Sequence, residues 1–291
     1  MHWVTISKGV IPIFILHDEN MDKIDLPKGV IPLDVFISSI GKERELESIE
    51  GKSGVIDYGF LYKERNIELK LLLKAKDTRD YRLIRDEVYD TLDRIYYVSE
   101  EYQPGKIYRV SVDSSYIPER YRSNNQRFAE VEVDCVVVGL PFSESIGTTK
   151  DIDKNGINSE AELWGYGMGL IADDDSLIYT HTKNNFMIYN AGNVPVHPFE
   201  QQLKITIDDV RGSSKEFQLR NKTNGTTFKV NEGVKSNQEI VLDGANITSN
   251  GLAYLRKTNK QYIVLEKGWN EFEVNGATSA RISFDFKFYY L

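Results

Sequence analysis

Residues 151–162, DIDKNGINSEAE, have the residue types and spacing that could bind calcium. The candidate oxygen ligands and turn glycine are Asp151, Asp153, Asn155, Gly156 and Glu162. Oxygen ligands at alternate positions, a glycine and a final carboxylate are what a calcium loop of the EF-hand type requires. However, Asn158 stands where such loops carry an apolar residue, and no amphipathic helix is expected on either side. We therefore interpret this segment as a solvated acidic linker.

Other polar groups that could do chemistry are scattered. The histidines are His2, His17, His181 and His197. None lies four residues from another, and Cys135 is the only cysteine, which argues against a zinc site. The acidic run ADDDS at 172–176 is typical of a solvated loop. GYGMG at 165–169 lacks the lysine and following helix of a phosphate loop. We expect no catalytic residues, no cofactor and no metal.

Composition places the chain among soluble globular proteins of two domains. It has 291 residues, of which 41% are hydrophobic and 27% charged. The 17 Tyr and 13 Phe favour strands. The formal net charge is −8, and neither half has a basic surplus, which argues against binding nucleic acid through its phosphates. No apolar run reaches the length of a membrane-spanning helix, and a lone cysteine is consistent with a reducing cytosol.

The first part of the chain combines alternating strands with one helix. The expected strands are 65–75, 106–112 and 128–138. In the last of these, Val131, Val133 and Cys135 alternate with acidic residues, so one face should be buried and Cys135 should lie in the core. One helical face is formed by Ile84, Val88, Leu92, Ile95 and Tyr96. Asp77 or Thr78 is expected to cap the start of that helix.

The second part reads as short strands separated by turns. We place the domain boundary in the polar stretch 143–162, which divides the chain into residues 1–146 and 147–291. The expected strands of the second domain are 203–208, 215–220, 226–230, 239–243, 261–265, 271–274 and 280–290. Short strands of this kind predict a β-sandwich. The last strand puts a stripe of apolar side chains on one face, Ile282, Phe284, Phe286 and Phe288.

Several segments together resemble the siphophage distal tail protein family. The segments in the first domain are SGVIDYGFLYKERNIELKLLLKA, the helix DYRLIRDEVYDTL, PGKIYRVSVDS and FAEVEVDCVVVGLPFSE. In the second domain they are FMIYNAGNVPVHP and the four C-terminal blocks FQLRNKTNGTTFKVNEG, EIVLDGANITSNG, YIVLEKGWNEFEVNGA and ARISFDFKFYYL. The resemblance rests on the order of these motifs along nearly the whole chain.

The resemblance implies a mainly β, structural protein of the virion tail tip that is made in the host cytoplasm and is not an enzyme. Residues 1–146 would be a β-sandwich with one α-helix, and six copies would close into a ring. That ring would join the tail tube protein to the tail-tip or fibre protein. Residues 147–291 would form a galectin-like or jelly-roll β-sandwich that anchors receptor-binding proteins or decorates the tip. The acidic charge suits a lumen through which DNA passes without specific binding.

Two alternatives remain open at this stage. A carbohydrate-binding module of the tail tip would stack sugars on aromatic side chains, for which Trp164, Trp269 and Tyr254 are candidates. Trp269, within EKGWNEFEV, is more typical of a packing residue beside a turn. A tail-associated hydrolase is the other alternative, although no recognisable nucleophile or metal set supports it. For the ring, we expect the polar segments 41–58 and 113–127 to reach a neighbouring subunit.

Overall fold

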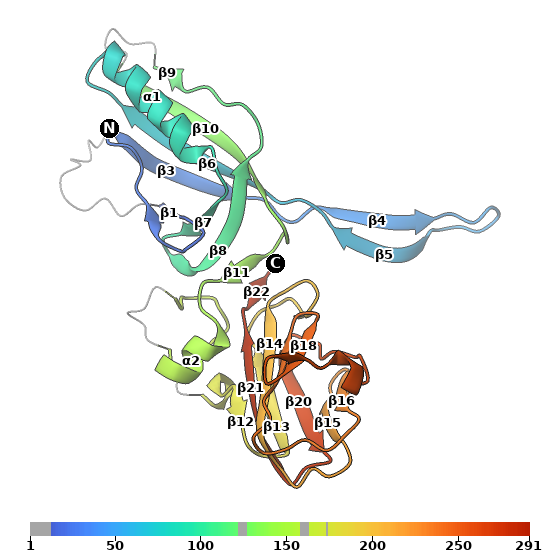
Figure 1. Cartoon of the computed structure of the whole chain (residues 1–291). Helices are drawn as coiled ribbons and strands as arrows, with labels where there is room; N and C mark the ends of the chain where they lie inside the picture. The colour runs from blue at the N-terminus through green and yellow to red at the C-terminus, as the bar shows by residue number, and fades with distance from the viewer. Residues whose placement is uncertain (1–12, 122–126, 158–162, 173) are drawn as a thin grey trace. The chain divides into compact units, whose positions relative to one another are not determined.

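The computed structural model describes residues 13–121, 127–157, 163–172 and 174–291 (Figure 1). The chain divides into two compact units, one that ends at Ser143 and also includes Leu291, and one from Glu144 to Tyr290. Strands dominate both units, so the mainly β, α+β prediction is confirmed. Within the described residues, no helix is long and apolar enough to cross a membrane.

The first unit is built around one antiparallel sheet that curls on itself. In the order of their pairing, its strands are β2 (Lys23–Ile24), β1 (Phe14–His17), β7 (Tyr96–Glu100), β8 (Gln103–Val112), β10 (Phe128–Val137), β6 (Asn66–Lys74) and β3 (Val30–Ile37). A short strand, β9 (Glu119–Arg120), pairs with β10. Strands β1 and β3, near the two ends of this path, also contact each other. The expected sandwich therefore takes the form of a single curled sheet around one core.

Strand β10 shows the alternation that the sequence predicts. Val131, Val133 and Cys135 are buried, whereas Glu132 and Asp134 are exposed. The Cys135 sulfur lies 3.2 Å from the hydroxyl of buried Tyr96. Burial raises the pKa of the Cys135 thiol to about 11, so the group is protonated at neutral pH. The prediction that Cys135 is a core residue is confirmed.

We predict that Val133→Ala will lower the free energy of unfolding by roughly 1–3 kcal/mol, because the side chain is fully buried and its removal leaves a cavity. Chemical denaturation measures the change. Asp134→Asn, at the exposed next position, is the matched control and should stay within about 0.5 kcal/mol. Equal effects of the two substitutions would contradict the observed strand register.

The helix of the first unit, α1 (Thr78–Leu92), begins as predicted. The Asp77 carboxylate accepts hydrogen bonds from the backbone N–H groups of Arg79 and Asp80, which caps the helix. Its buried face consists of Tyr81, Ile84, Val88 and Leu92 and packs towards β6. The prediction that Ile95 and Tyr96 continue this face is wrong. The helix ends at Leu92, and Tyr96 begins β7, where aromatic and β-branched residues alternate between buried and half-buried positions.

The second unit is a sandwich of two antiparallel sheets. One sheet contains β12 (Thr180–His181), β21 (Ser279–Phe286), β14 (Leu203–Arg211), β17 (Ile240–Asp243), β18 (Asn246–Ser249) and β19 (Leu252–Ala253). The other contains β13 (Asn185–Asn190), β20 (Gly268–Asn275), β15 (Phe217–Asn221) and β16 (Thr227–Val230). Smaller elements are β11 (Ser143–Ser145), which pairs with β22 (Tyr289–Tyr290), and the 3₁₀ turns η1 (Asp175–Leu177) and η2 (Leu255–Lys257). Phe272 of one sheet meets Phe284 of the other, with ring centroids 4.9 Å apart, and the predicted apolar stripe is buried.

One predicted strand of this unit is wrong. Residues 261–265 form only an isolated bridge, between Leu265 and Val196. The side-chain amides of Asn221 and Asn224 both donate to the carbonyl oxygen of Val264. Side chains thus satisfy a backbone group that would otherwise need a neighbouring strand.

The interpretation of 151–162 as a solvated acidic linker is also wrong for residues 151–155, which the structure describes as part of a helix. Helix α2 (Thr149–Asn155) forms there, and Asp151 accepts a hydrogen bond from the Thr148 backbone N–H at its start. Thr149 is fully buried, and its hydroxyl donates to the Phe284 carbonyl oxygen at 2.7 Å. Asp153 accepts hydrogen bonds from the backbone of Tyr179 and the hydroxyl of Thr180. Helical geometry separates the oxygens that a calcium loop would bring together, while Asn158 and Glu162 lie outside the described residues.

Candidate assembly surfaces

The first unit carries a two-stranded hairpin, β4 (Lys42–Glu47) and β5 (Ile56–Tyr62), that pairs with no other described strand. Every residue of β4 is exposed, as is every residue of β5 except Tyr62. Figure 1 shows the hairpin extending away from the sheet of its own unit. Gly59 has φ of +109°, which a residue with a side chain rarely adopts, and it lies near the register shift in this ladder. The polar segment predicted at 41–58 is therefore part of a projecting ribbon.

The hairpin combines internal polar contacts with an apolar surface. Arg44 forms an ion pair with Asp57, and the Tyr58 hydroxyl donates to Glu47 at 2.7 Å. These contacts hold the ribbon together without any support from the core. Its exposed large apolar side chains are Leu46, Ile49, Val55, Ile56, Tyr58, Phe60 and Leu61. Such a concentration of exposed apolar groups is typical of a surface that a partner covers.

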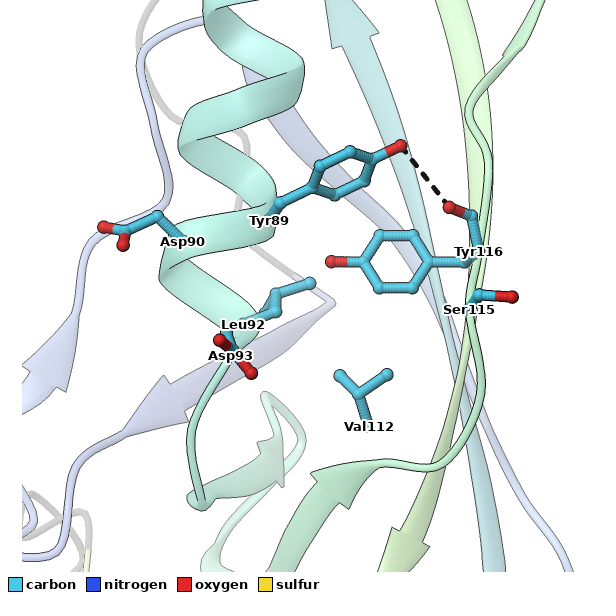
Figure 2. Close-up of a pocket in the computed structure, with 7 residues that line it drawn as sticks. All are labelled: Tyr89, Asp90, Leu92, Asp93, Val112, Ser115 and Tyr116. Carbon is cyan, nitrogen blue, oxygen red and sulfur yellow. Dashed lines mark hydrogen bonds between the residues drawn. The ribbon is translucent and has the colours of Figure 1, made fainter.

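A pocket of about 550 Å³ lies elsewhere on the first unit, between the end of α1 and residues 112–116 (Figure 2). Its walls include the rings of Tyr89 and Tyr116, which pack edge to face with centroids 5.3 Å apart. The Tyr89 hydroxyl also lies 3.4 Å from the backbone carbonyl of Tyr116, to which it donates. Leu92 and Val112 add apolar surface. The segment predicted at 113–127 thus forms one wall of a hollow, although residues 122–126 lie outside the described part.

The charge of this pocket is negative. Asp90 and Asp93 are among its lining residues, and the last turn of α1 contains no basic residue. The carbonyl end of a helix adds a partial negative charge to that of the carboxylates. The pKa of Tyr116 is raised to about 12, mainly because the side chain is partly buried. The pocket is therefore suited to an apolar side chain or to the apolar stem and charged head of a lysine or arginine.

The aromatic candidates of the second unit have different surroundings. Trp164 is 7% exposed and packs against Phe288, so it has no free face for a sugar. The Tyr254 hydroxyl donates to Glu232 at 2.9 Å. Trp269 is 41% exposed and lies 5.0 Å from the Tyr189 ring on the neighbouring strand. Of the three predicted residues, Trp269 alone offers an exposed ring beside a second aromatic side chain.

His17, His181 and the acidic residue Asp174 make contacts with other residues of the fold. The ring of buried His17 lies 3.1 Å from the Ser99 hydroxyl, and the ring of His181 stacks on Phe186 at 4.6 Å. Asp174 caps η1 by accepting from the Ser176 backbone. In the described ranges, no three His, Cys, Asp or Glu side chains come together as a metal site. His2 lies outside those ranges.

Comparison with known proteins identifies the class of the first unit. Residues 25–135 match the model of the family described as phage tail protein RIFT-related domain. The matched residues contain helix α1 and the projecting hairpin. They also contain most of the curled sheet, from β3 to most of β10, but not β1 and β2. Comparison with curated proteins found no match.

The whole chain is similar in fold to a solved phage tail protein, and this likeness together with the family match of residues 25–135 bears out the predicted resemblance to siphophage distal tail proteins. It is similar to the Dit (gp 19.1) protein of phage SPP1, described as a paradigm of the hub adsorption apparatus in phages that infect Gram-positive bacteria. The TM-score is 0.63 at 12% sequence identity, and the match covers 95% of this chain and 99% of that protein. Chains of the phage p2 baseplate in its activated conformation with Ca or Sr match at TM-scores of 0.38 and 0.36, with 13% and 12% identity, over 94% of this chain and 97% of theirs.

Part of these surfaces could be predicted from the sequence. It indicates residues 41–58 and 113–127 as segments that could contact a neighbour, but predicts both to be polar. The sequence does show apolar residues here, such as Val55, Ile56 and Phe60, but only the structure shows that they are exposed. The pocket residues Tyr89 and Asp93 had no signal in the sequence, since only the packing of α1 beside residues 112–116 brings them to one hollow.

Proposed function

We propose that this chain is a structural hub protein of a phage tail tip, of which six copies close into a ring. The ring joins the tail tube protein to the tail-tip or fibre protein, and the second unit, a galectin-like sandwich, faces receptor-binding proteins. The phage tail family of residues 25–135 and the likeness of the fold to SPP1 Dit support this role. The observation that carries it is the projecting apolar hairpin, which has no partner strand in the described part of its own chain.

Ring closure requires two different complementary surfaces on each subunit. The hairpin is an exposed arm, and the pocket between α1 and residues 112–116 is a hollow on the same unit. Covering the apolar side chains of the arm removes about 25 cal/mol of unfavourable hydration for each Å² of apolar surface. We therefore assign the ring contacts to residues 1–146 and treat residues 147–291 as dispensable for closure.

The role needs no catalysis. SPP1 Dit, which this chain resembles in fold, is described as a hub of an adsorption apparatus. Asp151, Asp153 and Asp174 accept hydrogen bonds from backbone N–H or hydroxyl groups of the fold. The surplus of acidic over basic residues, 44 against 36, disfavours adhesion of DNA that passes through the lumen. We place the protein in the virion tail tip, after synthesis in the host cytoplasm.

Mass measurement of the purified full chain tests the proposal. The expected result is a species of about 200 kDa, six times the 33.4 kDa of one chain, whose population rises with concentration. Addition of the neighbouring tail proteins should increase that population. A chain that stays monomeric both alone and with those neighbours would contradict the hub role.

A second candidate function has one observation in its favour. Exposed Trp269 lies beside Tyr189 on the outer face of the second sheet of the second unit, and a pair of aromatic rings is the usual platform for stacking a sugar. This unit would then be a carbohydrate-binding module that contributes to host adsorption. Glycan-array binding that disappears in Trp269→Ala would support it, and an array with no bound glycan would contradict it.

A further inference from the structure

One face of the β4–β5 hairpin is aromatic and positively charged, as the register of its strands shows. Lys42 lies opposite Tyr62, and the next pair on the same face is Arg44 opposite Phe60. The Lys42 ammonium group lies 4.7 Å from the centre of the Phe60 ring and 5.6 Å from that of Tyr62. Asp57, which forms an ion pair with Arg44, offsets one of the two charges. We call this side of the hairpin the cationic face.

The opposite side of the same hairpin is acidic. Successive side chains of a strand point to opposite faces, so three residues of β4 point to this side, Glu43, Glu45 and Glu47. Leu61 is the register partner of Glu43, and the Tyr58 hydroxyl donates to Glu47. Lys63 offsets one of the three charges through its ion pair with Glu43. We call this side the acidic face.

Solubility explains the charges of the hairpin but not its apolar side chains. Charged residues on an exposed strand protect it from aggregation. Both faces nevertheless place exposed apolar groups between their charges, Leu46 and Phe60 on the cationic face, and Ile56 and Leu61 on the acidic face. Apolar groups among charges of one sign are typical of a surface that meets a partner of the opposite sign.

We infer that the cationic face of one hairpin packs against the acidic face of the hairpin of the next copy of this chain. Strands that stack face to face lie about 10 Å apart, which brings Lys42 and Arg44 of one copy within reach of the glutamates of the next. The exposed apolar side chains of the two faces then cover one another. The inference rests on the proposed ring and adds that the hairpin meets its own counterpart on the neighbouring copy.

The difference between the two faces also favours a ring over a symmetric dimer. A symmetric dimer would bring two cationic or two acidic faces together, and like charges at an interface repel. A head-to-tail contact between unlike faces leaves one face of each kind free at the ends of a growing assembly. Those two faces meet when the ring closes.

Two charge-reversed forms of the full chain test this contact. Lys42→Glu with Arg44→Glu makes both faces acidic. Glu43→Lys with Glu45→Lys makes both faces basic. Each form alone should need about tenfold or more protein than the natural chain to form rings, because faces of like charge then meet. An equimolar mixture should form rings within about threefold of the natural concentration, because each face again meets one of opposite charge. Mass photometry over a concentration series measures all three.

Restored rings in the mixture would also show that the substitutions leave the hairpins intact. Arg79→Glu with Arg82→Glu reverses two exposed charges on α1 of the same unit. This matched control should form rings as the natural chain does. An equal loss in the control would assign the effect to net charge and overturn the inference.

The other outcomes separate the inference from the ring itself. Rings formed by either reversed form alone at the natural concentration would overturn the inference, since closure would not depend on the two faces. A mixture that fails while the natural chain forms rings would overturn the inference and leave the ring standing. If neither the natural chain nor the mixture assembles, alone or with the neighbouring tail proteins, the ring and the inference fall together.

Discussion

Replacing residues 43–61 with a short Gly-Ser turn is expected to convert the ring into single chains. The replaced residues are exposed, so the core of the first unit should keep its contacts and the chain should remain folded. The substitution removes all seven exposed apolar side chains of the hairpin, and with them the surface that we assign to the neighbouring subunit. Mass photometry or light scattering should then find a species close to one shortened chain at concentrations where the intact chain forms rings.

A smaller change separates the loss of contact from the loss of the hairpin. Leu46→Ser with Leu61→Ser keeps the ribbon but removes two exposed leucines, and it should weaken ring formation. Tyr102→Ser, which removes an exposed side chain of the same unit outside the hairpin, is the control. Rings that persist after the hairpin is replaced would show that closure uses another surface. Rings lost equally in Tyr102→Ser would show that the effect is not specific to the hairpin.

The largest expected loss of stability is that of Phe284→Ala, roughly 3–5 kcal/mol, which should act on the second unit alone. The ring of Phe284 is 1% exposed and contacts Phe186 and Phe272 across the sandwich, so its removal opens a cavity between the two sheets. Buried Trp164 lies in the same unit and provides a fluorescence signal for its unfolding. Denaturation followed by that signal should shift to a lower concentration of denaturant.

The same variant tests whether the second unit is needed for the ring. Under conditions where its second unit has unfolded, the variant should still form rings, since we place the contacts in residues 1–146. Tyr166→Ala, which removes a 90% exposed ring from the same unit, should change stability by no more than about 0.5 kcal/mol. A ring that dissociates together with the fluorescence transition would place essential contacts in the second unit.

The elements that could be predicted from sequence are those whose burial follows a local period. Val131, Val133 and Cys135 alternate with acids, and Ile84, Val88 and Leu92 recur at helical spacing, so both faces are visible without any knowledge of their partners. The same holds for the stripe that includes Phe284 and Phe286. Order and spacing of such segments were also enough to indicate the class of phage tail protein.

Elements that depend on distant partners were decided only by the tertiary structure. Thr149 becomes buried because its hydroxyl meets the backbone of Phe284, which is 135 residues away, and Asp153 becomes a structural acid because Tyr179 and Thr180 lie beside it. A polar side chain is equally compatible with water and with a buried hydrogen bond, so its sequence neighbours do not determine its place. The exposed hairpin shows the converse. In β5, Ile56, Tyr58 and Phe60 alternate with other residues much as they would in a buried strand, and only the folded chain shows that β4 is their sole partner strand in the described part of the chain. We therefore assign that surface to another subunit.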